Sequence, residues 1–208
     1  MTATYFDLNE LINHYQKETQ KYFLSSSWFN VKKENKTLEK MKKFFAEQKN
    51  PFERSCQAGH FTGSCWLINP AGDKAALCFH KKLKLWLQLG GHCDGCPDLS
   101  EVSMKEAQEE SGIKNLEFWP FLKKEKKALA FDFDIHTIPE NKKDLEHLHL
   151  DVRFVIQAKE SDLVLSDESL DLKWFAFNEI KNITQEESVT RQLDKFLLLS
   201  KLSKPCEY

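Results

Sequence analysis

The sequence predicts a protein of the α/β kind, more narrowly α+β, in which helices pack on a mixed β-sheet. Apolar residues recur at helical spacing near both ends of the chain, while short β-like runs bounded by turn residues occupy the middle. These two kinds of segment do not alternate regularly. Regular alternation would favour a doubly wound parallel sheet, so its absence favours a mixed sheet covered by helices.

Residues 1–52 are expected to form a helical extension ahead of a main domain over residues 53–208. Asp7 followed by Glu10 matches the capping box of a helix start. A second helical stretch carries apolar residues at helical spacing, at Leu38, Met41, Phe44 and Phe45. Pro51 closes this stretch, because proline disfavours helix in the residue before it. Such an extension could serve as a lid or as a contact in a homodimer, and both remain open.

From His60 onward the sequence pattern changes to short runs that are typical of β-strands. A hairpin is expected at residues 61–69 and 75–80, with NPAGD as its turn. Further strands are expected at residues 84–89, 127–138, 149–158 and 172–177. Gly90-Gly91 is expected as a turn, followed by a loop and a helix over residues 98–111, and Gly112 suits the left-handed residue that often ends a helix. A final helix is expected at residues 187–201, with one apolar side.

Charge and composition exclude several classes of protein. Lys and Arg number 30 against 32 Asp and Glu, so a net charge of -2 gives no field that recruits nucleic acid. No apolar run reaches the roughly 18 residues that a membrane span needs, and the first residues lack a signal-peptide pattern. We therefore expect a cytoplasmic protein with neither nucleic acid nor membrane as partner. Six cysteines at irregular spacing favour free thiols, and the Cys93 to Cys96 pair lacks further zinc ligands in its context.

The segment Gly90 to Ile113, GGHCDGCPDLSEVSMKEAQEESGI, carries the clearest chemistry. Glu106, Glu109 and Glu110 stand at i, i+3 and i+4 and therefore share one face of the predicted helix. Such a cluster of carboxylates is locally unfavourable unless a cation lies among them. Hard oxygen ligands of this kind suit Mg²⁺ or Mn²⁺, and these ions suit phosphate substrates. The alternative from composition alone is a solvated acidic helix face.

This segment resembles the Nudix box, which is Gly, five residues, Glu, seven residues, then Arg-Glu-U-x-Glu-Glu-x-Gly-U, with U aliphatic. Counting from Gly91, the last seven defined positions fall on Lys105, Glu106, Ala107, Glu109, Glu110, Gly112 and Ile113. Pro97 replaces the first Glu and Lys105 replaces the Arg, two positions that support the helix and loop in the family. The resemblance covers most of residues 54–200, through WLQLGGHCDG, HLHLDVRF and similar segments.

The resemblance implies a Nudix-type α/β/α sandwich and a hydrolase that cleaves a diphosphate linkage in a nucleoside diphosphate derivative by water attack at phosphorus. It implies that Glu109 and Glu110 hold Mg²⁺ or Mn²⁺ together with the Gly90 carbonyl, and that Glu106 completes the shell or orients the water. Lys105 would steer a carboxylate or ligand electrostatically. A general base often comes from a loop outside the box; of the candidates Asp167, Glu168 and Asp171, we favour Glu168.

Histidines provide a second candidate feature. His147, His149 and Asp151 alternate along one predicted strand and share a face, with Arg153 beside them as a possible phosphate ligand. Asp134 and His136 repeat this spacing on another predicted strand. The face could bind substrate phosphates or a second metal, or its histidines could be satisfied by backbone groups. His60, His80 and His92, taken singly, are expected to be structural.

Two other functions compete with hydrolysis. A non-catalytic ligand sensor could share the fold, although it would have no need of three repelling glutamates. An isomerase related to isopentenyl diphosphate isomerase could also share it, but the context Gly63-Ser64-Cys65-Trp66 does not match the cysteine motif of that enzyme. The expected partner in the leading hypothesis is a small nucleotide-like diphosphate.

Overall fold

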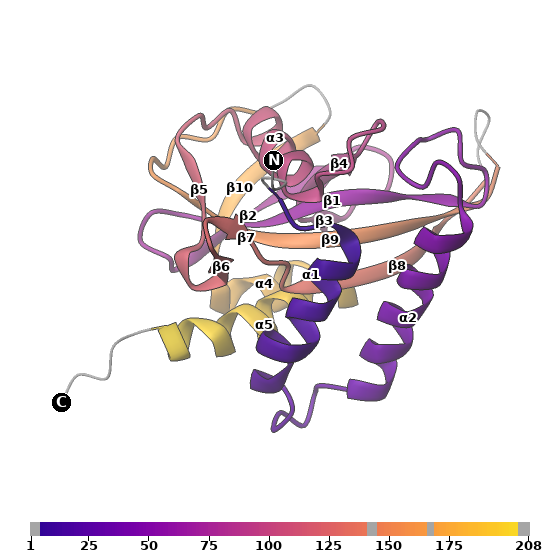
Figure 1. Cartoon of the computed structure of the whole chain (residues 1–208). Helices are drawn as coiled ribbons and strands as arrows, with labels where there is room; N and C mark the ends of the chain where they lie inside the picture. The colour runs from indigo at the N-terminus through magenta and orange to yellow at the C-terminus, as the bar shows by residue number, and fades with distance from the viewer. Residues whose placement is uncertain (1–4, 141–144, 166–168, 204–208) are drawn as a thin grey trace.

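The computed structural model describes residues 5–140, 145–165 and 169–203. A twisted β-sheet forms its middle layer (Figure 1). Helix α3 (Leu99–Ser111) covers one side of the sheet, while α1 (Leu8–His14), α2 (Val31–Glu47), α4 (Phe177–Ile183) and α5 (Glu187–Ser203) lie on the other. This layered arrangement of helices around a sheet confirms the predicted fold class.

Eight strands make up the main sheet, at Gly59–Ile68 (β1), Lys74–His80 (β2), Trp86–Leu87 (β3), Leu89–His92 (β4), Leu116–Phe118 (β5), Asp132–Ile138 (β8), His147–Ala158 (β9) and Ser169–Ala176 (β10). Their central order is β10-β2-β1-β9-β5, with β3 paired to β2, β4 to β1 and β8 to β9. Strands β1 and β9 run parallel, whereas the other pairings are antiparallel. The sheet is therefore mixed, as predicted. Strands β6 (Lys123–Lys124) and β7 (Lys127–Ala128) form a separate ribbon.

The hairpin predicted at residues 61–69 and 75–80 is present as β1 and β2. Asn69 closes its turn, because the side-chain carbonyl oxygen accepts hydrogen bonds from the backbone N–H groups of Asp73 and Lys74, both at 3.0 Å. Beyond the turn, β4 pairs with β1 from Cys65 to Thr62 and β3 pairs with β2. The prediction of a turn at Gly90-Gly91 was therefore wrong, because both glycines lie inside β4, opposite Ser64 and Gly63 of β1.

Local signals set the helix ends. Asp7 accepts from the Glu10 N–H at 2.8 Å and the Glu10 carboxylate accepts from the Asp7 N–H at 2.9 Å, which confirms the capping box of α1. A π-helical turn (Tyr15–Thr19) and a 3-10 turn (Gln20–Tyr22) continue α1, and a second 3-10 turn lies at Pro120–Leu122. The predicted helices at 98–111 and 187–201 correspond to α3 and α5.

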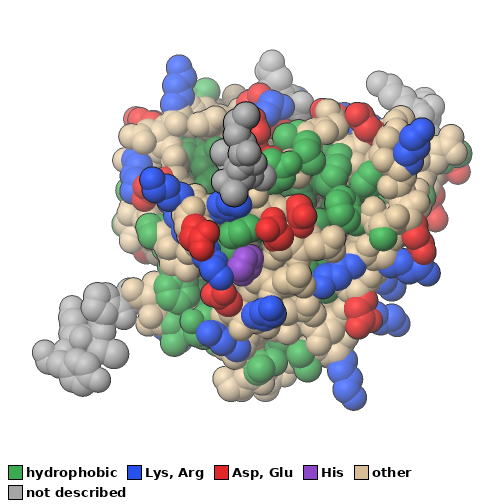
Figure 2. Space-filling model, in the orientation of Figure 1, with side chains coloured by type: hydrophobic (Ala, Val, Ile, Leu, Met, Phe, Trp, Pro, Cys, Tyr) green, Lys and Arg blue, Asp and Glu red, His purple; other side chains and the backbone are tan. Residues whose placement is uncertain are grey.

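The N-terminal helices belong to the main hydrophobic core. Leu11, Tyr15 and Leu38 are fully buried with Phe133 of β8 and Phe196 of α5 in one cluster. A smaller cluster beneath α3 contains Cys65, Ala107 and Ile156. Acidic and basic side chains are interspersed on the face drawn in Figure 2, as the near balance of charge predicts. Across the described ranges, no helix combines the length and apolar character that a bilayer crossing requires.

Candidate active site

Helix α3 is held tightly against β1. Asp98 caps its start, accepting from the N–H groups of Ser100 at 3.0 Å and Glu101 at 3.1 Å, and Gly112 ends it at a φ of 70°. A Cβ built on Gly63 of β1 would lie 2.9 Å from the Leu99 carbonyl oxygen. Only a glycine lets helix and strand approach this closely, so the position of the helix carboxylates is fixed by the sheet.

Two of the three predicted glutamates lie against the Gly90-Gly91 segment of β4. The Gly90 N–H donates to Glu110 Oε2 at 2.8 Å. A Cβ built on Gly91 would lie 2.6 Å from the Glu106 carboxylate, whose side chain is only 15% exposed. Glu109 is more open, with 58% of its side chain exposed. The structure thus brings Glu106 and Glu110 together with both glycines, while Glu109 flanks them nearer to solvent.

Lys105 lies beside this group of carboxylates. Its Nζ is 3.4 Å from Glu109 Oε2 and 3.9 Å from Glu106 Oε1. A hydrogen bond to Glu109 raises the pKa of Lys105, so the ammonium remains charged at neutral pH. A hollow of about 520 Å³ adjoins it and is lined in part by Lys126 and Lys127. Three lysines therefore line one hollow beside α3, together with Asp98 and Glu101.

The loop before α3 lacks the Glu and Arg pair of the Nudix box, because Pro97 and Lys105 stand at these positions. Arg54, which lies outside the box, instead holds this loop by two hydrogen bonds to Asp94. Its Nε lies 2.5 Å from Asp94 Oδ1, and a second nitrogen lies 2.9 Å from Oδ2. The hydrogen bond from Arg54 holds the pKa of Asp94 below its usual range. In addition, the Gly95 N–H donates to the Phe52 carbonyl at 3.1 Å.

The predicted general base falls largely outside the described residues. Asp167 and the favoured Glu168 both lie there. Asp171 is described on β10, opposite Phe79 of β2. Its carboxylate accepts from its neighbour's backbone N–H at 2.9 Å and pairs with the exposed Lys173. Asp171 is thus a surface ion-pair partner on this strand.

Arg153 differs from the expected phosphate ligand. Its side chain is fully buried, and its guanidinium donates to Asp151 at 2.7 Å, Asp132 at 2.7 Å and Asp134 at 3.3 Å. A phosphate could reach it only by displacing these carboxylates. Asp151 is likewise committed, because it also accepts from the hydroxyls of Thr62 at 2.9 Å and Ser64 at 2.7 Å. Both residues therefore fasten β8, β9 and β1 together instead of facing a ligand.

This buried group of charges extends to the helices. Lys195 of α5 is fully buried, with its Nζ 2.8 Å from Tyr15 Oη, 2.5 Å from Glu34 Oε1 and 2.6 Å from Asp132 Oδ1. Arg191 donates to Asp132 and Asp134 from the same helix. Of these residues, sequence reasoning did not single out Lys195, Arg191, Glu34 and Asp132. One feature of the sequence could have indicated that Lys195 is buried: it stands four positions before Leu199, on the apolar side of an amphipathic helix.

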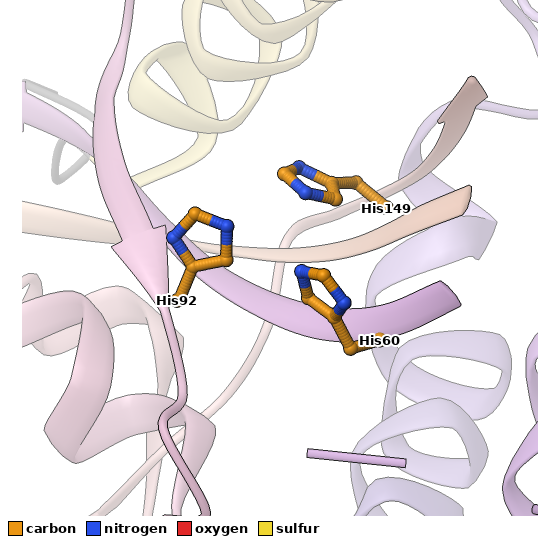
Figure 3. A group of neighbouring side chains, drawn as sticks. All are labelled: His60, His92 and His149. Atoms are coloured by element: carbon orange, nitrogen blue, oxygen red, sulfur yellow. The ribbon is translucent and has the colours of Figure 1, made fainter. Parts of the chain in front are cut away.

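The histidines form a cluster that only partly matches the prediction. His149 lies opposite His60 in the β1–β9 pairing and opposite His136 in the β8–β9 pairing. His92 of β4 joins His60 and His149, and Figure 3 shows their three rings gathered around one point. His147 stacks on His60 with ring centroids 5.1 Å apart. The predicted face with His147, His149 and Asp151 exists, and His60 and His92, each expected to be structural, also meet there.

The remaining candidate histidine lies elsewhere. His80 Nδ1 accepts from the Leu83 N–H at 3.1 Å and so helps to close the turn between β2 and β3. A second hollow, of about 600 Å³, opens between α2, β8 and α5 and includes His136, Asp134 and Arg191 among its lining residues. The five described cysteines, at positions 56, 65, 78, 93 and 96, are free thiols.

Comparison with known proteins gives structural likenesses. No protein-family model matches the sequence, and neither does any curated protein. A C. elegans Ap4A hydrolase matches with 16% identity and a TM-score of 0.53, over 68% of this chain and 97% of the other. A NUDIX-family hydrolase from Clostridium perfringens is 27% identical over 67% of this chain and 97% of its own, with a TM-score of 0.49. The NUDIX domain of Shewanella oneidensis NrtR, complexed with ADP ribose, is 15% identical over 78% of this chain and 98% of its own, also with a TM-score of 0.49. The likeness to the C. elegans structure shows the fold, and it confirms the predicted Nudix-type architecture.

Proposed function

We propose that this chain, which has the Nudix fold, is a Mg²⁺- or Mn²⁺-dependent hydrolase that cleaves a diphosphate linkage in a nucleotide derivative. The observation that carries the proposal is the placement of Glu106 and Glu110, with Glu109 beside them, at the Gly90-Gly91 segment. Water would attack phosphorus and expel a phosphate leaving group. The C. elegans structure of similar fold is an Ap4A hydrolase, so dinucleotides belong among the first substrates to screen.

The residues at this segment fit a hard divalent cation. Their donor atoms are carboxylate oxygens, which Mg²⁺ and Mn²⁺ prefer. Gly91 leaves free the space that a Cβ would take beside Glu106. In the proposal, Glu109 and Glu110 hold the cation with the Gly90 carbonyl, and Glu106 completes the shell or orients the attacking water. Bound there, the cation would polarise phosphoryl oxygens and neutralise charge developing on the leaving group.

In the proposal, lysines of the chain bind the substrate beside this group. Lys105, Lys126 and Lys127 line the same hollow, and ammonium groups attract phosphate as point charges. We propose that the diphosphate of the substrate lies along this hollow, with its scissile bond toward Glu106 and Glu110. Lys105 then has two roles, because it also limits the repulsion between Glu106 and Glu109.

An isomerase mechanism that depends on a reactive cysteine is disfavoured. Cys65, the residue considered for it, is fully buried. Burial also raises the pKa of the Cys65 thiol well above its ordinary value, so it offers no thiolate near neutral pH.

The test is a substrate screen with the purified protein and Mg²⁺ or Mn²⁺, reading phosphate products from dinucleotides, nucleotide sugars and nucleoside triphosphates. Glu109→Gln should lower kcat by about 100-fold or more, the scale on which loss of one charge-stabilising group acts. Glu117→Gln is the matched control, since Glu117 lies on β5 in an exposed pair with Lys159, and it should retain full activity.

Unchanged turnover in Glu109→Gln would overturn the assignment of the cation site. Absence of turnover by the unaltered protein on every substrate would overturn hydrolysis itself and favour a ligand sensor. Circular dichroism of each variant separates a lost site from a lost fold.

A further inference from the structure

The register of three strands brings three histidines together on one face of the sheet. His60 of β1 is the direct partner of His149 of β9. His92 of β4 is the partner of Thr62, which is two residues from His60 and so on the same face. Figure 3 shows the three side chains reaching from separate strands toward a common point. Because β-sheet pairing fixes their backbones, the cluster is built into the sheet.

The geometry of the cluster matches a set of metal ligands. One ring nitrogen from each of the three histidines lies within 4.8 Å of the others. Their ring centroids are 4.7 Å apart for His60 and His149, 5.0 Å for His92 and His149, and 5.1 Å for His60 and His92. Three imidazoles at this separation can point their lone pairs at one ion of bond length about 2.0–2.1 Å.

Buried nitrogens without partners point to a missing ligand. Within the described part of the chain, both ring nitrogens of His60 and Nε2 of His149 are buried and have no hydrogen-bond partner. Buried polar atoms in folded proteins are nearly always satisfied, so three such nitrogens in one cluster require an explanation.

We propose that His60, His92 and His149 bind a divalent transition metal of the Zn²⁺ type, at a site separate from the carboxylates of α3. Three histidines and one open position form a known ligand set for Zn²⁺, whereas Mg²⁺ and Ca²⁺ prefer oxygen. The two sites lie on opposite faces of β4, because Gly91 faces Glu106 and the next residue, His92, faces the histidine cluster.

Among the described residues, two neighbours of the cluster already have partners of their own. Asp151, the carboxylate two residues beyond His149, is already occupied by Thr62, Ser64 and Arg153. His147 stacks on His60, and its Nδ1 lies 2.7 Å from the Leu145 carbonyl oxygen, to which it donates. In the proposal, Asp151 and His147 therefore flank the three ligands and are not counted among them.

The experiment uses Co²⁺ as a probe, because four-coordinate Co²⁺ absorbs far more strongly in the visible range than six-coordinate Co²⁺. The full-length protein is stripped with a chelator and titrated with CoCl₂ in excess MgCl₂, which competes for oxygen ligands. We expect one equivalent to bind with the intense spectrum, and ZnCl₂ to displace it. The same metals should raise the Tm of the unaltered protein, a readout that needs no variant.

Co²⁺ binding by single-residue variants tests which side chains form the metal site. His92→Gln and His149→Gln should each weaken Co²⁺ binding by more than about 100-fold, since loss of a group that merely orients a ligand costs about 10–100-fold. Glu109→Gln and His80→Gln should bind Co²⁺ as the unaltered protein does, because neither residue belongs to the cluster.

The proposal is overturned if Co²⁺ gives no intense spectrum in the unaltered protein, if folded His92→Gln or His149→Gln binds with unchanged affinity, or if Glu109→Gln abolishes binding. No substrate enters these measurements. Their failure is therefore distinct from failure of the hydrolase proposal.

Discussion

Asp132 is the central anion of the buried charge group, so its removal gives the sharpest test of how the helices are held to the sheet. Its side chain is fully buried. Oδ2 accepts from Arg153 at 2.7 Å and Arg191 at 3.0 Å, while Oδ1 accepts from Arg191 at 3.0 Å and Lys195 at 2.6 Å. Asp132→Asn keeps the shape of the side chain and removes its charge beside three cations.

The expected loss in the free energy of unfolding is about 3–5 kcal/mol, because breaking a buried pair leaves uncompensated charge away from water. For a chain of 150–250 residues this corresponds to a fall in Tm of roughly 6–20 °C. Urea unfolding followed by circular dichroism gives the free energy, and a thermal scan gives the Tm. Asp171→Asn is the matched control, because its exposed pair with Lys173 should contribute no more than about 1 kcal/mol.

A loss below about 1 kcal/mol in Asp132→Asn would refute this reasoning, since it falls within the range of an exposed pair. Such a result would mean that the neighbouring acids, Asp134 and Glu34, satisfy the cations without Asp132.

Two further predictions concern the buried charge group around Asp132 and the packing of α3 on β1. Burial alone would raise the pKa of Asp132, but the surrounding cations hold this pKa well below its usual range. The stabilising contribution of the Asp132 carboxylate is therefore complete above about pH 4, and it is lost as the pH falls through the lower pKa of the folded state. The urea midpoint of the unaltered protein should therefore fall more steeply between pH 5 and pH 2 than that of Asp132→Asn, and parallel curves would contradict this. Gly63→Ala should destabilise the fold by about 1–3 kcal/mol in urea unfolding, because the added Cβ would lie 2.9 Å from both the Leu99 carbonyl oxygen and Val102 Cγ1; an unchanged midpoint would show that α3 can move away freely.

Much of the fold could be predicted because its signals are local. Asp7 with Glu10, Asp98 and Gly112 mark helix ends through contacts with residues two to four positions away, and the structure has each of these contacts. Strand β4 was the main error in the sheet. The sequence GGH has little β-propensity, and its strand conformation depends on pairing with β1, which no local signal shows.

In the candidate site, too, local sequence signals predict one part and miss another. Helical spacing alone places Glu106, Glu109 and Glu110 on one side of α3, and the structure adds the position of β4 beneath them. The histidine cluster depends on which strands are neighbours. His60 and His92 are separated by thirty-odd residues in sequence, and period-two alternation gives the face of each strand without its partner.

The buried network could not be predicted for an energetic reason. Arg153 and Lys195 are of residue types that are almost never fully buried unless paired, so sequence alone favours placing them in water or at a ligand. Apart from Asp151, which lies on the same strand as Arg153, their charged partners lie on other elements. A charge in the interior is tolerated only when such partners are present together.

The contact between Lys195 and Tyr15 joins residues 180 positions apart in the chain. During synthesis, Tyr15 and Glu34 leave the ribosome long before α5 has been translated, at a rate of about 5–20 residues per second. Until then, the Glu34 and Asp132 carboxylates lack the ammonium group that both of them contact. We therefore expect the nascent chain to hold its first helices loosely docked, and to close its interior only once the last helix has emerged.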